Sequence, residues 1–207
     1  MAVKKRISGE ERKERIVAAA ENLFSRKGFK GTTTKEVAKD AGISEAVIFR
    51  YFADKSDLYA AIINRCCDDK HGNLKLAGRV KGKSGKGAFI AIADYFLELY
   101  AEDTTFARLL LFSALEKNKF SDMFIESRGV ETLNLVCGLI KDGIRRSEFK
   151  KRIDPELSAR AFLGMVLHYC MTQEILGFKR FFSRPQKKVA EAFAGIFLNG
   201  ISNSRAR

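Results

Sequence analysis

The feature that most constrains this chain is the spacing of small and apolar residues in residues 33–55, which read TTKEVAKDAGISEAVIFRYFADK. Ala38 leaves room for two short helices to cross closely, and Gly42 suits the tight turn between them. Apolar side chains from both helices can then be buried at the crossing: Val37, Ile43 and Ile48. This spacing is typical of a helix-turn-helix, whose second helix is held out to enter a DNA major groove.

Both short helices also carry start signals. Thr33 with Glu36 three residues later forms a capping box, and Ser44 can accept hydrogen bonds from the first amides of the second helix. The alternative to a helix-turn-helix is an ordinary helical hairpin with small residues at its crossing.

At these residues the chain resembles the DNA-binding domain of the tetracycline-repressor (TetR/AcrR) family of bacterial transcription regulators. The family pattern has a glycine and a Thr-Thr start, then Ile-Ala-x-x-Ala-Gly-Val-Ser, then Gly-x-Leu-Tyr-x-His/Tyr-Phe and a lysine three residues later. The matching residues here are Gly28, Thr32, Thr33, Val37, Ala38, residues 41–44, Ala46, Ile48, Phe49, Tyr51, Phe52 and Lys55. The match covers roughly the first quarter of the chain.

Two positions depart from the family pattern. Ala46 stands where glycine is common, which limits how closely the backbone can approach DNA, and Phe49 replaces a tyrosine whose hydroxyl often meets a phosphate. Both changes alter particular contacts, but the helical scaffold is retained because alanine is a better helix former than glycine.

The resemblance implies two kinds of contact with double-stranded DNA. Phosphate contacts are expected from Thr34, Ser44, Tyr51 and Lys55, with the amides at the helix starts assisting. Thr33 is a further candidate DNA-binding residue. Base contacts are expected from the outward positions of the second helix, Glu45, Ala46, Val47 and Arg50, with Lys35 of the first helix nearby. Phe49 is a further candidate DNA-binding residue. Arg50 or Lys35 could read guanine, Glu45 could accept from cytosine, and Ala46 or Val47 could meet a thymine methyl. For the charged residues a solvated helix surface is the alternative.

Charge supports a polyanionic partner without identifying it. The 207 residues hold 38 Lys and Arg against 25 Asp and Glu, a net charge of +13 and a pI near 9.7. Such an excess favours nucleic acid or an anionic membrane surface, so a basic peripheral membrane protein is the rival from another class. Residues 161–171, the longest nearly continuous apolar stretch, fall short of the roughly 20 residues that a spanning helix needs. With no apolar run after Met1, we expect a cytoplasmic protein that does not bind membranes.

The cysteine and histidine residues do not form the spacing of a catalytic pair or of a metal-binding site. The cysteines, at positions 66, 67, 137 and 170, are expected to be free thiols. Cys67 and His71 lie one helical turn apart, but no second pair of ligands accompanies them. Cys170 and His168 are two residues apart on a helix and so point in different directions. We therefore expect no enzyme, no metal site and no cofactor.

The whole chain reads as an all-α protein because nearly every segment has a helical period. A three-helix DNA-binding domain is expected at 1–55, and a larger helical domain for effector binding and dimerisation at 56–207. Expected helix starts are Ser8 with Glu11, Asp54, Asp154 with Pro155, and Ser183 with Gln186. Further helices are expected near 87–101, 104–116 and 121–146. The fourth helix should run towards His71. Glycines with lysines in residues 70–86 predict a mobile loop or frayed helix end, the expected boundary within the larger domain, and a solvated connector is favoured there over a second nucleic-acid contact.

The resemblance also implies a function for the larger domain. In the family its last two long helices form a four-helix dimer interface, and it binds a small molecule that alters the spacing of the two reading helices. Candidates for lining an apolar cavity are Phe89, Tyr95, Phe106, Phe112, Phe124, Met165, His168 and Tyr169, although packing alone can explain most of them. The expected protein is a homodimeric repressor that binds a near-palindromic operator and is released by a mostly apolar effector.

Overall fold

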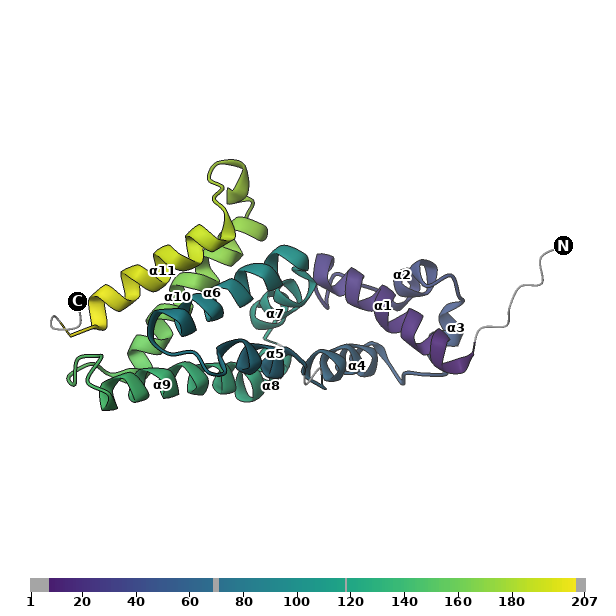
Figure 1. The fold of residues 1–207 in the computed structure, drawn as a ribbon. Coiled ribbons are helices and arrows are strands. Elements are labelled where there is room, and N and C mark those ends of the chain that lie inside the picture. Colours follow the sequence, from purple (N-terminus) through teal and green to yellow (C-terminus); the bar gives the residue numbers. More distant parts are fainter. Residues whose placement is uncertain (1–7, 69–70, 118, 204–207) are drawn as a thin grey trace. The chain divides into compact units, whose positions relative to one another are not determined.

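The computed structural model describes residues 8–68, 71–117 and 119–203. Its elements are α1 (Gly9–Lys27), α2 (Thr34–Asp40), α3 (Glu45–Ile48), α4 (Lys55–Asp68), α5 (His71–Val80), α6 (Gly85–Glu102), α7 (Thr105–Leu115), α8 (Lys119–Phe124), the π-helical turn η1 (Ile125–Gly129), α9 (Val130–Arg145), α10 (Pro155–Glu174), the 3-10 turn η2 (Phe178–Arg180) and α11 (Gln186–Ile201) (Figure 1). Over the described ranges this confirms the all-α prediction, and none of these helices is long and apolar enough to cross a membrane. The side chains of Cys67 and His71 lie outside the described residues.

The chain divides into two compact units, each with its own apolar core. The first unit contains α1 to α4 together with α7 and α8, and the second contains α5, α6, η1, α9, α10, η2 and α11. The chain therefore leaves the first unit after α4 and returns to it for residues 105–124. A functional boundary after residue 55 stays a prediction.

In the first unit α1 packs against α2, α4 and α7 (Figure 1). The predicted capping box at its start is confirmed, because Glu11 N donates to Ser8 Oγ at 3.1 Å and Ser8 N donates to Glu11 Oε2 at 2.8 Å. Ile16, Ala20 and Phe24 face the core and are fully buried. The predicted Asp54 cap of α4 is also confirmed, since Asp57 N donates to Asp54 Oδ1 at 2.8 Å.

The connector expected at residues 70–86 was wrong, because α5 occupies His71–Val80 and α6 begins at Gly85. Leu76 and Val80 are one helical turn apart and buried, and α5 packs against α6. This burial stabilises a helix despite Gly78, which is exposed.

The second unit is centred on α6, which contacts α5, α9, α10 and α11. Phe89 on α6 packs its ring at 4.9 Å from Phe162 and at 5.0 Å from Phe197, centroid to centroid. The predicted start of α10 is confirmed: Asp154 Oδ1 accepts from Glu156 N at 2.8 Å and from Leu157 N at 3.0 Å.

Two helix boundaries in the second half of the chain differ from prediction. The single helix expected over 121–146 is divided by the π-helical turn between α8 and α9. The cap expected from Ser183 was wrong, because α11 starts after Pro185 without a side-chain cap. Gln186, the residue expected to pair with Ser183 at this helix start, instead donates to the Leu97 carbonyl at 3.3 Å.

Candidate DNA-binding surface and ligand pocket

The helix-turn-helix begins at the predicted capping box of α2. Glu36 N donates to Thr33 Oγ1 at 3.2 Å, and Thr33 N donates to Glu36 Oε2 at 2.9 Å. Lys27 Nζ lies 2.6 Å from Glu36 Oε1. Its hydrogen bond, followed by those from Thr33, lowers the pKa of the Glu36 carboxyl to about 2.

The turn between α2 and α3 follows the predicted spacing. Gly42 has φ +68°, a left-handed conformation that suits glycine, and Ile43 N donates to the Ala38 carbonyl at 3.0 Å. Val37 and Ile48 are completely buried. The side-chain cap expected from Ser44 was wrong: this residue precedes α3, but its hydroxyl makes no capping hydrogen bond.

A side-chain pair that the sequence did not predict joins α2 to α3. Thr34 Oγ1 donates to Glu45 Oε1 at 2.5 Å, and both side chains are half-buried. A short hydrogen bond to a carboxylate is stronger than one between neutral groups. The two groups that we expected to meet phosphate and cytosine are therefore held against each other in this structure.

The remaining candidates divide by exposure. Thr33, Lys35, Ser44, Ala46 and Arg50 are exposed, and Phe49 is 50% exposed. Val47 and Tyr51 are half-buried. Tyr51 Oη lies near the start of α1, 3.7 Å from where a Cβ would stand at Gly9. The exposed set includes one arginine and one lysine with the reach to contact DNA, and their roles stay predictions.

Lys55 makes contacts within the first unit. Its Nζ donates to the Phe29 carbonyl at 2.9 Å and to the Thr32 carbonyl at 3.0 Å, and it lies 4.3 Å from the centre of the Phe29 ring. The ammonium group thus holds the turn between α1 and α2. Whether it also meets a phosphate stays a prediction.

The candidate ligand residues do not gather at one place within a unit. Phe106, Phe112 and Phe124 belong to the first unit, where the rings of Phe106 and Phe124 lie 4.8 Å apart. In the second unit Phe89 is buried in the core, while Tyr95 and Met165 are half-buried against it. His168 is exposed on α10. Tyr169 alone among these candidates borders the pocket described next.

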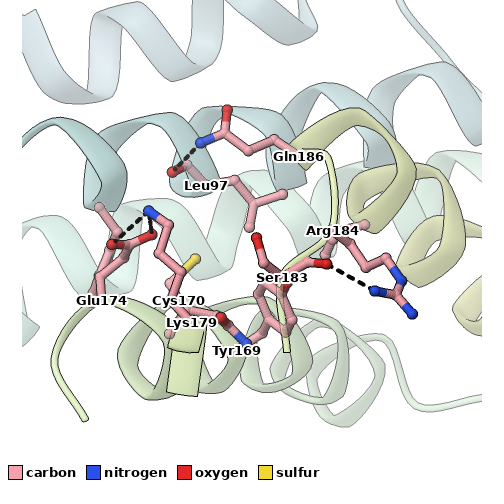
Figure 2. A pocket seen from close by; sticks show the side chains of 11 residues that line it. Leu97, Tyr169, Cys170, Glu174, Lys179, Ser183, Arg184 and Gln186 are labelled. Carbon is pink, nitrogen blue, oxygen red and sulfur yellow. Dashed lines mark hydrogen bonds and ion pairs between the residues drawn. The ribbon is translucent and has the colours of Figure 1, made fainter. Parts of the chain in front are cut away.

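That pocket lies where α10, α11 and the segment between them meet α6 (Figure 2). Its lining consists of Leu97, Tyr100, Tyr169, Cys170, Gln173, Glu174, Lys179, Ser183, Arg184, Gln186 and Val189. Lys179 is ion-paired with Glu174 at 2.8 Å. Burial raises the pKa of the Cys170 thiol to about 12, so this thiol is protonated. The volume of about 50 Å³ is well below the roughly 300 Å³ or more of drug-sized ligand sites.

Sequence reasoning missed most of this lining. Lys179, Ser183 and Arg184 come from the segment between two helices, and the sequence carries no periodic signal that would bring them beside Cys170.

Comparison with known proteins agrees with the DNA-binding surface. The family model described as "Bacterial regulatory proteins, tetR family" matches residues 16–62. YvkB, an uncharacterized HTH-type transcriptional regulator of Bacillus subtilis, is 28% identical over 192 residues, which are 91% of this chain and 96% of YvkB. BepR, an HTH-type transcriptional repressor of Brucella suis, is 28% identical over 164 residues, which are 75% of this chain and 77% of BepR.

The solved structures show the same fold. FadR from Bacillus subtilis, determined in complex with stearoyl-CoA, has a TM-score of 0.71 at 19% identity, over 91% of this chain and 98% of that chain. Fold and site together define a helix-turn-helix transcriptional regulator, and its curated relatives regulate transcription. Over residues 16–62 the chain matches the tetR family of bacterial regulatory proteins, and over most of its length it is similar to HTH-type transcriptional regulators.

Proposed function

We propose that this protein is a cytoplasmic repressor that binds a near-palindromic operator as a homodimer and is released by a mostly apolar small molecule. The observation that carries the proposal is the helix-turn-helix, in which Ala46 on α3 and Phe49 and Arg50 directly after α3 are exposed. Arg50 is assigned to a base edge, and Thr33, Ser44 and Tyr51 to the phosphates. Phosphate contacts position the protein, and base contacts select the sequence.

The test is recovery of genomic DNA fragments bound by the purified protein, followed by titration of the recovered site. We expect a nearly palindromic protected site and a steep loss of affinity with salt, because several phosphates are neutralised. Arg50→Ala should relax base choice at particular positions, with a cost of about 1–3 kcal/mol on the operator. Equal losses on operator and random DNA would make Arg50 a backbone contact. Retention on anionic vesicles without fragment recovery would favour the peripheral membrane alternative.

The dimer is proposed to form through α10 and α11. Both helices leave small or apolar residues exposed on a face that the second unit does not cover: Leu157, Ala161 and Gly164 on α10, and Ala192 and Ile196 on α11. Small residues let two helices approach closely, as a helical dimer interface requires.

Gly164→Arg is a clean test of this interface, because a Cβ at Gly164 would meet no atom within 4 Å in the protomer. The variant should keep its helical circular dichroism but sediment as a monomer, since the arginine is introduced between the two subunits. Gly78→Arg is the matched control, because Gly78 is also exposed with open space around it, on α5. A dimeric Gly164→Arg would place the interface elsewhere.

The effector is proposed to enter the second unit at the pocket around Tyr169 and Cys170. Since its present volume is small, binding must open it, and a ligand that prefers the opened form shifts the population towards that form. The similar FadR was solved with stearoyl-CoA, so acyl-CoAs of increasing chain length are reasonable first probes. We expect one of them, or another apolar compound, to weaken operator binding about fivefold to a hundredfold. Tyr169→Trp should blunt that response and leave DNA binding without the compound nearly unchanged.

A further inference from the structure

A carboxylate directly after α7 accepts hydrogen bonds from the turn that precedes the helix-turn-helix. Glu116, in the residue position that follows α7, accepts from Phe29 N at 3.0 Å through Oε2 and from Lys30 N at 3.1 Å through Oε1. The two residues of the turn lie 87 and 86 positions away in sequence. Arg108, on α7, donates from Nε to the Ser25 carbonyl at 2.8 Å. Two charged side chains, one on α7 and one directly after it, thus hold the end of α1 and the turn that follows α1.

The turn is shaped to admit this carboxylate. Gly28 has φ +73°, and a Cβ there would lie 2.6 Å from Glu116 Oε1 and 2.9 Å from Phe112 Cδ1. Any other residue would therefore both strain the backbone and displace α7 side chains. Thr32 closes the turn, because its buried hydroxyl donates to the Gly28 carbonyl at 2.9 Å.

Opposite charges hold the two kinds of backbone group in this turn. Glu116 accepts hydrogen bonds from the amides of Phe29 and Lys30, whereas Lys55 donates hydrogen bonds to the carbonyls of Phe29 and Thr32. The next residue, Thr33, is the N-cap of α2. Whatever fixes the turn therefore fixes where the first helix of the DNA-binding motif begins.

We propose that Glu116 is a positioning residue for operator binding, through which α7 sets the placement of α2 and α3. The proposal rests on the proposed function, because it concerns the same DNA-binding motif. Only Asp103 and Thr104 separate α7 from α6 of the second unit, so the chain itself ties α7 to the part of the protein proposed to bind the effector.

The negative charge of Glu116 allows a positioning role to be distinguished from a general electrostatic effect on DNA affinity. Removing a carboxylate from a DNA-binding protein should strengthen, or leave unchanged, its attraction to phosphates. If Glu116 positions the motif, Glu116→Gln should instead lose affinity for the operator, because a specific complex needs the reading helix in register. Affinity for random DNA of the same length should stay equal or rise slightly.

The experiment compares Glu116→Gln with Asp122→Asn, which removes the same charge from an exposed position on α8. Operator and random duplexes are titrated with each full-length protein at two salt concentrations. Glu116→Gln should bind the operator about fivefold to tenfold more weakly, while Asp122→Asn matches the wild type. Without DNA, hydrogen exchange at the Phe29 and Lys30 amides should be faster in Glu116→Gln alone, since glutamine offers only one acceptor oxygen, so one amide loses its acceptor and the other keeps an uncharged one.

Glu116→Asp serves as a second variant, because it keeps the charge on a side chain one methylene shorter. If Glu116→Gln does not fold by circular dichroism, Glu116→Asp carries the test, and it should show a smaller operator loss with the same selectivity. Unchanged operator binding by a folded variant overturns the proposal, as does an equal loss on operator and random DNA. If the wild-type protein recovers no DNA fragments, the proposed function fails. If the wild type binds its operator and the Glu116 variants bind it equally well, only the positioning role of Glu116 fails.

Discussion

Replacing Lys55 by methionine tests whether this residue is primarily structural. The change keeps an unbranched side chain of similar length but removes the ammonium that donates to the Phe29 and Thr32 carbonyls and lies over the Phe29 ring. Hydrogen bonds from charged groups contribute about 1.5–3 kcal/mol each, and a cation–π contact about 0.5–1 kcal/mol at partly exposed sites. These contributions are not additive, and Lys55 is only half-buried, so water can replace part of the loss. We expect about 2 kcal/mol of destabilisation of the first unit.

For a unit of this size, about 2 kcal/mol corresponds to a fall in melting temperature of roughly 8–16 °C. The assay is thermal unfolding followed by circular dichroism at one fixed protein concentration, because dimerisation makes the melting temperature concentration-dependent. Lys35→Met is the matched control, since Lys35 is exposed on α2, and it should shift the melting temperature by less than a few degrees. If Lys55→Met melts like Lys35→Met but binds all DNA sequences more weakly, Lys55 is a phosphate contact and the structural reasoning is refuted.

Three further predictions concern single side chains. Because the folded pKa of Glu36 is lowered from 4.5 to about 2, its contribution to stability is present above pH 4.5 and lost as the pH falls towards 2, so acid titration of Glu36→Gln should lack that component. Gly28→Ala should lower the melting temperature by several degrees, because its Cβ meets Glu116 and Phe112 at a positive φ; an unchanged melting temperature would mean that α7 can retreat at little cost. The Cys170 thiol, with its pKa raised to about 12 by burial, should resist iodoacetamide at pH 8 until the protein unfolds, as read by peptide mass mapping.

The sequence predicted best where the physical cause lies within a few residues. The boxes at Ser8 and Thr33 and the caps at Asp54 and Asp154 each depend on a side chain that accepts from amides two or three positions later. The same reasoning was wrong at Ser44, whose hydroxyl makes no capping hydrogen bond to α3. Local spacing therefore predicts where a helix starts more reliably than which side chain completes its cap.

Prediction was wrong where tertiary burial overrode local composition. Glycines and lysines in residues 70–86 indicated a connector, but Leu76 and Val80 bury one face of α5 against α6. Two apolar residues in a short segment are a weak periodic signal, and their burial depends on a partner helix that the local sequence does not specify.

The residues that hold the DNA-binding motif in place could not be predicted for a different reason. Glu116 meets the turn after α1 and Arg108 meets the last turn of α1, both across more than 80 positions of sequence, and no local pattern marks either residue as a partner. Gly28 was matched as part of the family motif, yet its close approach to Glu116 depends on that distant partner. A single sequence thus identifies the DNA-binding motif from local spacing, whereas the contacts that connect it to the rest of the chain emerge only from the packed structure. Effector control would have to act through such contacts, because a ligand changes operator affinity only if the contacts holding the reading helices differ between the two states.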